Sequence, residues 1–315
     1  MLNRRLTTER FSVGGRQRPA AVGAAFTLVE LLVVVAVLTI LASILFPVFG
    51  QAREQAKRAQ DISNLRQCAH AIFMYRDDNG NRCVPVNSWG FGSPFFGAWH
   101  GPGRSEHDMP WPENVQPYAK SWHVFRGPMD PDASDESLSR VPGSGEYVPP
   151  DQTARRHWAW AWRSSYGLNY NWLSYPVTFD QAATMKNVGW SSIGSPARTI
   201  LLVDSIGGRE PSGRPRGGGS WAVDAPAAPA DLRAWLGGWK CYYAPNNGDP
   251  NSPGCKALWN AWGGCFPFFS GGQVFNLSFA DGHASGQRLG QLIRGVNPFN
   301  RQILDLDEYQ WDTIR

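Results

Sequence analysis

The chain has 315 residues, enough for one large domain or two small ones, and its 42% hydrophobic content permits a substantial core. Its 34 Gly, 24 Pro and 15 Trp indicate a loop-rich, aromatic-rich β protein and argue against a helical bundle. The net charge of +4 resides entirely in residues 1–25, so nothing in the rest of the sequence predicts a nucleic-acid partner.

Residues 1–25 form a basic leader, with five arginines and one glutamate, in front of a long apolar run. Basic residues at this place predict that the leader lies in the cytoplasm. An ordinary secretory signal has its small residues after the apolar segment, whereas here residues 21–25 supply them before it. Cleavage there would remove the leader and leave the apolar segment on the mature protein.

The next predicted element is one long helix over residues 26–76. Its first part, Phe26 to Phe49, would span roughly 36 Å at 1.5 Å per residue, and a hydrocarbon core is about 30 Å thick. Beyond it the sequence turns polar, but apolar residues keep a spacing of three or four up to the stop signal at 77–80. We therefore predict a transmembrane half at 28–49 and an amphipathic second half, with Pro47 loosening the helix between them.

Glu30 places a carboxylate inside the apolar run. An acid at the centre of a membrane helix costs about 2.5–3.5 kcal/mol, and less near an end. One interpretation is a signal anchor in which Glu30 snorkels to the interface. The other is that cleavage before Phe26 creates a cationic α-amine, which Glu30 of an axially shifted neighbouring copy neutralises. The two charges would then specify a register between packed helices.

The segment "FTLVELLVVVAVLTILASILFPVFGQAREQAKRAQDISNLRQ" resembles the start of type IV pilins and type II secretion pseudopilins. It is similar above all to a bacterial family with a prepilin-type cleavage and methylation segment and a β-rich C-terminal domain. The resemblance implies that a prepilin peptidase cuts between Ala25 and Phe26 and methylates Phe26. It also implies that Thr27, Glu30 and Pro47 belong to the assembly segment. Ala25 departs from the family, which usually has Gly before the cut.

Beyond the helix, the sequence predicts short strands separated by turns. We expect strands in 165–175, 198–205 and 273–285, and the Asp281-Gly282 pair in the last of these predicts a hairpin. The predicted fold class is α+β: a long N-terminal helix packed on an antiparallel, β-rich, pilin-like head. This exported head would comprise residues 77–315.

Four segments of the head extend the resemblance: "VFRGPMDP", "SYGLNYNW", "SPARTILLVDS" and "FADGHA". The family has a His-x9-Asp-Gly motif in its C-terminal domain. Asp281 and Gly282 match this motif, but Gly271 stands where the His would be. Gly127 likewise stands where relatives often carry Cys. No role that depends on these two missing side chains is transferred to this chain.

Asp204, Asp281 and His283 are the candidate acid, base or metal-ligand residues, if they meet in one cleft. We favour the alternative, in which Asp281-Gly282 makes a turn, His283 opens the returning strand and Asp204 ends another. The sequence contains no Gly-x-Ser-x-Gly, phosphate-loop or His-Glu-x-x-His pattern. We therefore predict that the protein is not an enzyme.

Calcium is the one cofactor considered, because hard cations take oxygen ligands and pseudopilin heads sometimes hold calcium. The candidate ligands are Asp130, Asp132 and Asp135, with a second group at 246–251. Neither spacing fits an EF-hand loop, and such clusters commonly form turns.

Disulfides are permitted in an exported domain. The pairs Cys241–Cys255 and Cys255–Cys265 would each staple a loop, and Cys68–Cys83 is a further alternative. Five cysteines leave at least one without an intramolecular partner. The many tryptophans could form platforms for a sugar or protein, but we favour a role in the core.

Together these features predict a structural subunit of a type IV pilus-like filament or a type II secretion pseudopilus. Its partners would be copies of itself or other pilin-like subunits, the prepilin peptidase and the inner-membrane assembly machinery. It would lie in the bacterial inner membrane as a single-pass protein, with its head in the periplasm or on an extracellular filament. The alternatives are a membrane-anchored module that binds a glycan or protein without polymerising, and a membrane-tethered enzyme.

Overall fold

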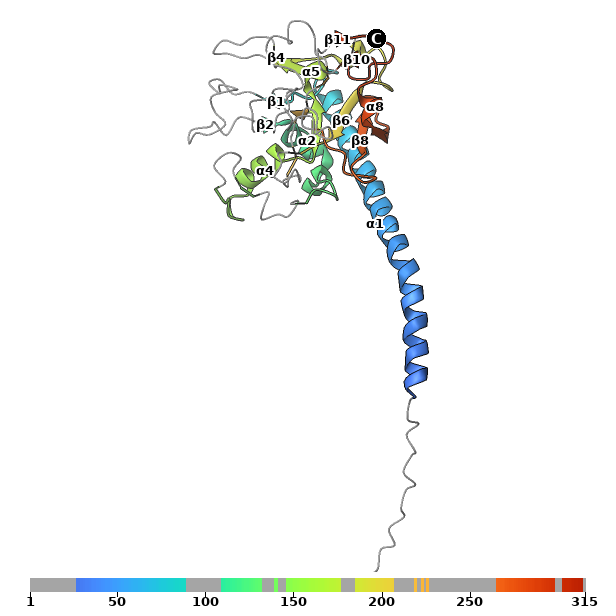
Figure 1. Cartoon of the computed structure of the whole chain (residues 1–315). Helices are drawn as coiled ribbons and strands as arrows, with labels where there is room; N and C mark the ends of the chain where they lie inside the picture. The colour runs from blue at the N-terminus through green and yellow to red at the C-terminus, as the bar shows by residue number, and fades with distance from the viewer. Residues whose placement is uncertain are drawn as a thin grey trace, which may run out of the picture. The chain divides into compact units, whose positions relative to one another are not determined.

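The computed structural model describes residues 27–88, 109–131, 139–140, 146–176, 185–206, 218–219, 222–223, 225–226, 265–297 and 302–313. The chain divides into two compact units, Met1–Gln51 and Ala52–Arg315. Helix α1 (Leu28–Asp78) runs through the boundary (Figure 1), so its apolar first part belongs to one unit and its polar second part belongs to the other.

Helix α1 is a single helix of 51 residues, which confirms the long N-terminal helix expected from the sequence. It continues through Pro47, although proline lacks the N–H that would bond the carbonyl of Ser43. The helix ends because Gly80 and Asn81 adopt φ values of +67° and +60°. The backbone N–H groups of Asn79 and Asn81 both donate to the carbonyl of Arg76, which closes the last turn.

The second unit is built around a five-stranded sheet in the order β7-β3-β6-β8-β9. Its strands are β3 (Tyr166–Asn169), β6 (Ile200–Asp204), β7 (Ala222–Val223), β8 (Val274–Phe279) and β9 (Ala284–Arg288). Strands β3, β6, β8 and β9 pair antiparallel, but β7 runs parallel to β3. The prediction of an entirely antiparallel head was therefore wrong for the β7 edge. The long connection between β3 and β7 allows the crossover that a parallel pair needs.

Short elements surround this sheet. The helices are α2 (Trp111–Ala119), α4 (Thr153–Trp162), α5 (Tyr170–Leu173) and α8 (Leu289–Leu292), with 3-10 turns η1 (Trp122–Phe125) and η2 (Trp190–Ser192). Three two-stranded ribbons pair β1 (Asn87–Ser88) with β2 (Met109–Pro110), β4 (Ser174–Pro176) with β5 (Met185–Asn187), and β10 (Val296–Asn297) with β11 (Gln302–Ile303). The predicted strand at 165–175 is thus two strands separated by α5.

Both faces of the central sheet are covered. On one face the second half of α1 contributes Leu65, Cys68 and Ile72 to a buried cluster with Tyr166 and Leu202. On the other face Phe275, Leu277 and Phe279 of β8 pack with Tyr309 and Trp311 near the C-terminus. All six side chains of β8 are consequently buried, although its alternating pattern is typical of a strand with one solvent face.

Candidate functional site

The first half of α1 is apolar around its whole circumference, and its large side chains are exposed in the single chain. It is the one helix among the described residues that is long and apolar enough to cross a membrane. Its hydroxyl groups are satisfied within the helix: Thr39 Oγ1 donates to the Ala36 carbonyl at 2.8 Å, and Ser43 Oγ donates to the Ile40 carbonyl at 2.7 Å. This segment therefore exposes few unpaired polar groups to an apolar environment.

Glu30 belongs to a capping box at the start of α1. The Thr27 backbone N–H and Oγ1 donate to Glu30 Oε2 at 2.9 and 2.8 Å, and the Glu30 N–H donates to Thr27 Oγ1 at 3.2 Å. The carboxylate thus satisfies donors that every helix start leaves unpaired, and it lies at the positive end of the helix dipole. The sequence interpretation missed this role, although Thr-x-x-Glu before an apolar run is its signature.

The structure describes only some of the other residues of the predicted processing and assembly segment. Ala25 and Phe26 lie outside the described residues. Pro47 lies inside the continuous helix, on its apolar half. The structure therefore brings together Thr27 and Glu30 and leaves the cleavage position a prediction.

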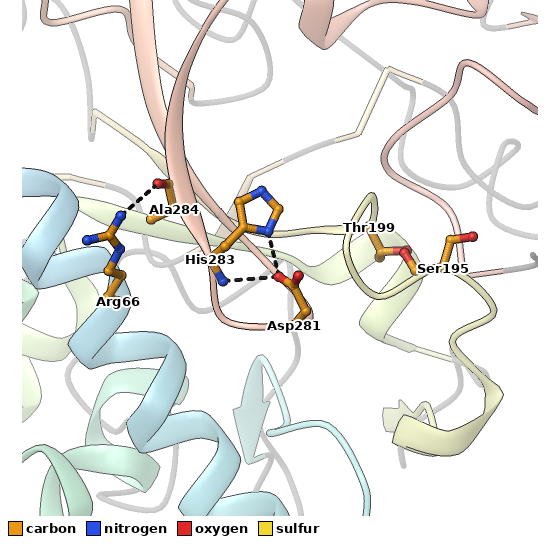
Figure 2. Close-up of polar contacts among 6 residues, drawn as sticks. All are labelled: Arg66, Ser195, Thr199, Asp281, His283 and Ala284. Carbon is orange, nitrogen blue, oxygen red and sulfur yellow. Dashed lines mark hydrogen bonds and ion pairs between the residues drawn. The ribbon is translucent and has the colours of Figure 1, made fainter.

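Asp281 and His283 form a closed turn between β8 and β9 (Figure 2). The His283 backbone N–H donates to Asp281 Oδ1 at 3.0 Å, and His283 Nδ1 lies 2.6 Å from the same oxygen. The His283 ring also stacks on Phe279, with centroids 4.1 Å apart. This geometry supports the turn interpretation. The turn lies next to the start of β6, where Ile200 pairs with Phe279, whereas Asp204 is the last residue of β6 and contacts Asn276. The three candidate residues therefore do not meet in one cleft.

The same turn lies against α1. Gly282 has a φ of +92°, and a Cβ at this position would lie 2.7 Å from Cε2 of Phe73. Figure 2 also shows Arg66 of α1 reaching the carbonyl of Ala284, at 3.5 Å. The Asp281-Gly282 pair therefore has a packing role, because only glycine allows this close approach to the helix. Gly271 also has a positive φ, +67°.

A buried polar cluster joins α1 to the sheet, and sequence reasoning missed its central pair. Asp61 and Asp204 are 2% and 1% exposed. Tyr166 Oη donates to Asp61 Oδ1 and Asn276 Nδ2 donates to Asp61 Oδ2, each at 2.8 Å, while the Asn276 backbone N–H donates to Asp204 Oδ2 at 2.9 Å. Asn276 thus bridges the two carboxyl groups, with its side-chain amide on Asp61 and its backbone N–H on Asp204. The sequence did hold a signal for the burial of Asp61. Asp61 precedes Leu65 by four residues, so the two share the buried face of α1.

Burial controls the protonation of this pair. It raises the pKa of Asp204 well above its ordinary value, and the nearby charge of Asp61 raises it further. Burial also raises the pKa of Asp61, although hydrogen bonds from Asn276, Asp204 and Tyr166 oppose that rise. Asp204 therefore retains its proton to a higher pH than an ordinary aspartate does.

Asp130, the described member of the calcium candidates, already has protein partners. Its Oδ2 accepts from Ser165 Oγ at 2.8 Å, and its Oδ1 accepts from the Gly218 backbone N–H at 2.9 Å. Asp132, Asp135 and the group at 246–251 lie outside the described residues. Within the described part of the chain, no group of three or more His, Cys, Asp or Glu side chains is arranged to hold a metal ion.

The described cysteines are buried, and Cys68 and Cys83 are free thiols, so the alternative Cys68–Cys83 disulfide is absent. Cys265 is buried next to β6, while its predicted partners Cys241 and Cys255 lie outside the described residues. The eight described tryptophans are buried or half-buried: Trp111, Trp122, Trp158, Trp160, Trp162, Trp172, Trp190 and Trp311. Seven of these eight belong to the two buried clusters or pack against them, Trp158 being the exception, which supports a core role for this part of the aromatic content.

Comparisons of the chain with protein-family models, with curated proteins and with solved structures found no match.

Proposed function

We propose that this protein is a pilin-like structural subunit, processed before Phe26 and assembled through the first half of α1 into a filament or pseudopilus. Its partners are copies of itself or related subunits. The observation that carries the proposal is the construction of α1. One uninterrupted helix combines an apolar, exposed first half that carries one acid with a second half whose Leu65 and Ile72 lie in the core of a folded head.

This construction suits side-by-side packing of stems. The exposed leucine, valine and isoleucine side chains from Leu28 to Phe49 offer contact on every side of the helix, first to lipid and then to neighbouring copies. A simple membrane anchor needs the same apolar length. An anchor would use Glu30 only to cap its own helix, whereas an assembled stem also needs its negative charge for a neighbouring amine, so the role of that charge distinguishes the two functions.

Under this proposal the Glu30 carboxylate both caps its own helix and pairs with the amine of a neighbouring copy. Its Oε2 accepts both hydrogen bonds from Thr27, and it leaves lone pairs on the second oxygen for a partner. A cationic amine at Phe26 of a shifted neighbour is the partner of opposite charge that cleavage would supply. Pairing within a low-dielectric stem bundle favours one register, because a shifted register leaves both charges unpaired.

Two measurements on the full-length protein in its host test the proposal. Mass spectrometry of the mature protein should find an N-terminal, N-methylated phenylalanine at position 26. Covalent cross-linking in isolated membranes should give a ladder of multimers that Glu30→Leu abolishes, while membrane insertion persists. A protein that retains its arginine-rich leader and cross-links only as a monomer would instead be the anchored binding module.

A further inference from the structure

The contact between α1 and the sheet includes buried polar side chains, although a purely hydrophobic contact would avoid the cost of burying carboxyl groups. Asp61 from α1 and Asp204 from β6 are both almost fully buried, and Asn276 of β8 donates hydrogen bonds to both carboxyl groups. Two ionised carboxylates that share one bridging residue in such a buried site repel each other strongly, because little water screens them. Some compensation is therefore built into this contact.

The charged and titratable groups that face the pair are few. Arg58 of α1 is a cation that faces the pair: its Nε donates to Asn276 Oδ1 at 3.4 Å, and its charge lowers the pKa of Asp204, against the effect of burial. Tyr166 of β3 faces Asp61, and burial raises its pKa well above the ordinary value, so it stays a neutral donor. The Cys68 thiol is buried on the same helix. Asp130 is separated from the pair by Ser165.

One proton completes this arrangement. Asp61 accepts from Tyr166 and Asn276, and its remaining capacity is met if Asp204 donates an O–H. Asp204 in turn accepts from the Asn276 backbone N–H with its second oxygen. Every strong donor and acceptor of the pair then has a partner, which is the condition for a buried polar cluster to stabilise a fold.

We propose that the Asp61–Asp204 pair is a proton-binding lock between the second half of α1 and the sheet. The pair stabilises the contact between helix and sheet while it holds one shared proton, and the contact loses this stabilisation when the proton is lost. The lock lies within Ala52–Arg315 and does not depend on assembly of the stem. On an exported head it would make the helix–sheet contact respond to the pH outside the cell.

The direction of the pH response follows from proton linkage. An unfolded aspartate titrates near pH 4 (about 3.9), and the folded pair holds its proton at higher pH. The stabilisation is therefore fully present below about pH 4 and is lost as the pH rises through the pKa of the folded pair. While one extra proton is bound in the folded state, the unfolding equilibrium constant rises about tenfold for each pH unit.

The test compares Asp204→Asn with the parent protein, both at full length in detergent micelles. The amide mimics a protonated Asp204, because its oxygen can accept from the Asn276 N–H and its NH₂ can donate to Asp61. Chemical unfolding is followed by tryptophan fluorescence between about pH 5 and pH 8. We expect the unfolding equilibrium constant of the parent to rise by about a further factor of ten per pH unit relative to that of Asp204→Asn. Parallel pH profiles for the two proteins would overturn the proposal.

Other groups titrate in this range, but they cancel in the comparison. Burial raises the pKa of Glu113 to about 7 and, with Arg156, lowers the pKa of His157; both residues are present in parent and variant. Asp151→Asn is the matched control, since Asp151 is an exposed carboxylate, and it should leave the parental profile unchanged.

A second measurement does not require a folded variant. Infrared spectroscopy of the parent with isotope-labelled aspartate should show the carbonyl band of a protonated aspartic acid at about pH 7, where ordinary aspartates are ionised. The band should disappear when the protein is unfolded by denaturant at the same pH. Its absence from the folded parent would overturn the proposal whatever the behaviour of Asp204→Asn.

Discussion

Gly282 illustrates how much one residue can decide in this protein. It combines a φ of +92° with a position directly against the ring of Phe73 on α1. The first property requires a left-handed turn between β8 and β9, and the second leaves no room for a side chain. The Asp-Gly pair expected to make a hairpin therefore also seats that hairpin on the helix.

Gly282→Ala should destabilise the protein by about 1–3 kcal/mol, because the new methyl group meets both a backbone penalty and a contact with Phe73. The free energy of unfolding of the full-length protein, from denaturant titration, measures the effect. Gly290→Ala in α8 is the control, since a Cβ there meets nothing within 4 Å and helical Ala is preferred to Gly. Equal stability of Gly282→Ala and the parent would contradict the packing role.

At the scale of elements, α1 is one continuous helix whose first half suits an apolar environment and whose second half packs on the sheet. Its first half exposes aliphatic side chains, while its second half buries Leu65, Ala69 and Ile72 against the sheet. The helix start is the point of greatest cost in a membrane, because unpaired N–H groups have no water there. Thr27 and Glu30 meet that requirement within the helix itself.

Glu30→Gln and Thr27→Ala separate the two roles of this capping box. Glutamine can still accept from Thr27 but carries no charge, whereas Thr27→Ala weakens the cap, by about 0.5–2 kcal/mol, and keeps the charge. If a neighbour's amine pairs with Glu30, then Glu30→Gln should sharply reduce multimers in membrane cross-linking and Thr27→Ala should retain them. The reverse result would mean that Glu30 serves only its own helix.

At the scale of the whole molecule, the second half of α1 is a part of the head's core. Cys68 on α1 and Cys83 beyond its end are both fully buried, and burial raises the pKa of the Cys83 thiol to about 12. The Cys68 Sγ lies 3.6 Å from the carbonyl of Val124, in the segment before the sheet. Neither thiol can react unless this unit opens.

Alkylation with iodoacetamide should therefore leave Cys68 and Cys83 unmodified in the native protein. Both should become modified at the denaturant concentration at which tryptophan fluorescence changes, because helix and sheet unfold together. Peptide mass spectrometry identifies each site. Modification of Cys68 before the fluorescence transition would show that α1 separates from the sheet on its own.

The sequence by itself determined the elements whose pattern is local. The apolar length of 28–49 predicted a membrane-compatible helix, the 77–80 stop lay within two residues of its end, and the Asp281-Gly282 hairpin formed where expected. These features depend on spacing and turn chemistry within a few residues, so no long-range information was needed.

Only the tertiary structure decided which distant residues meet. The less favoured catalytic interpretation placed Asp204 beside Asp281. In the structure Asp204 ends β6, as the favoured interpretation had it, and shares Asn276 as a hydrogen-bond partner with Asp61, which no local pattern predicted. The parallel β7 edge and the covering of both sheet faces were equally outside the reach of local patterns. Strand order and helix docking join residues far apart in the chain, and a local hydrophobic pattern does not specify which partner covers it.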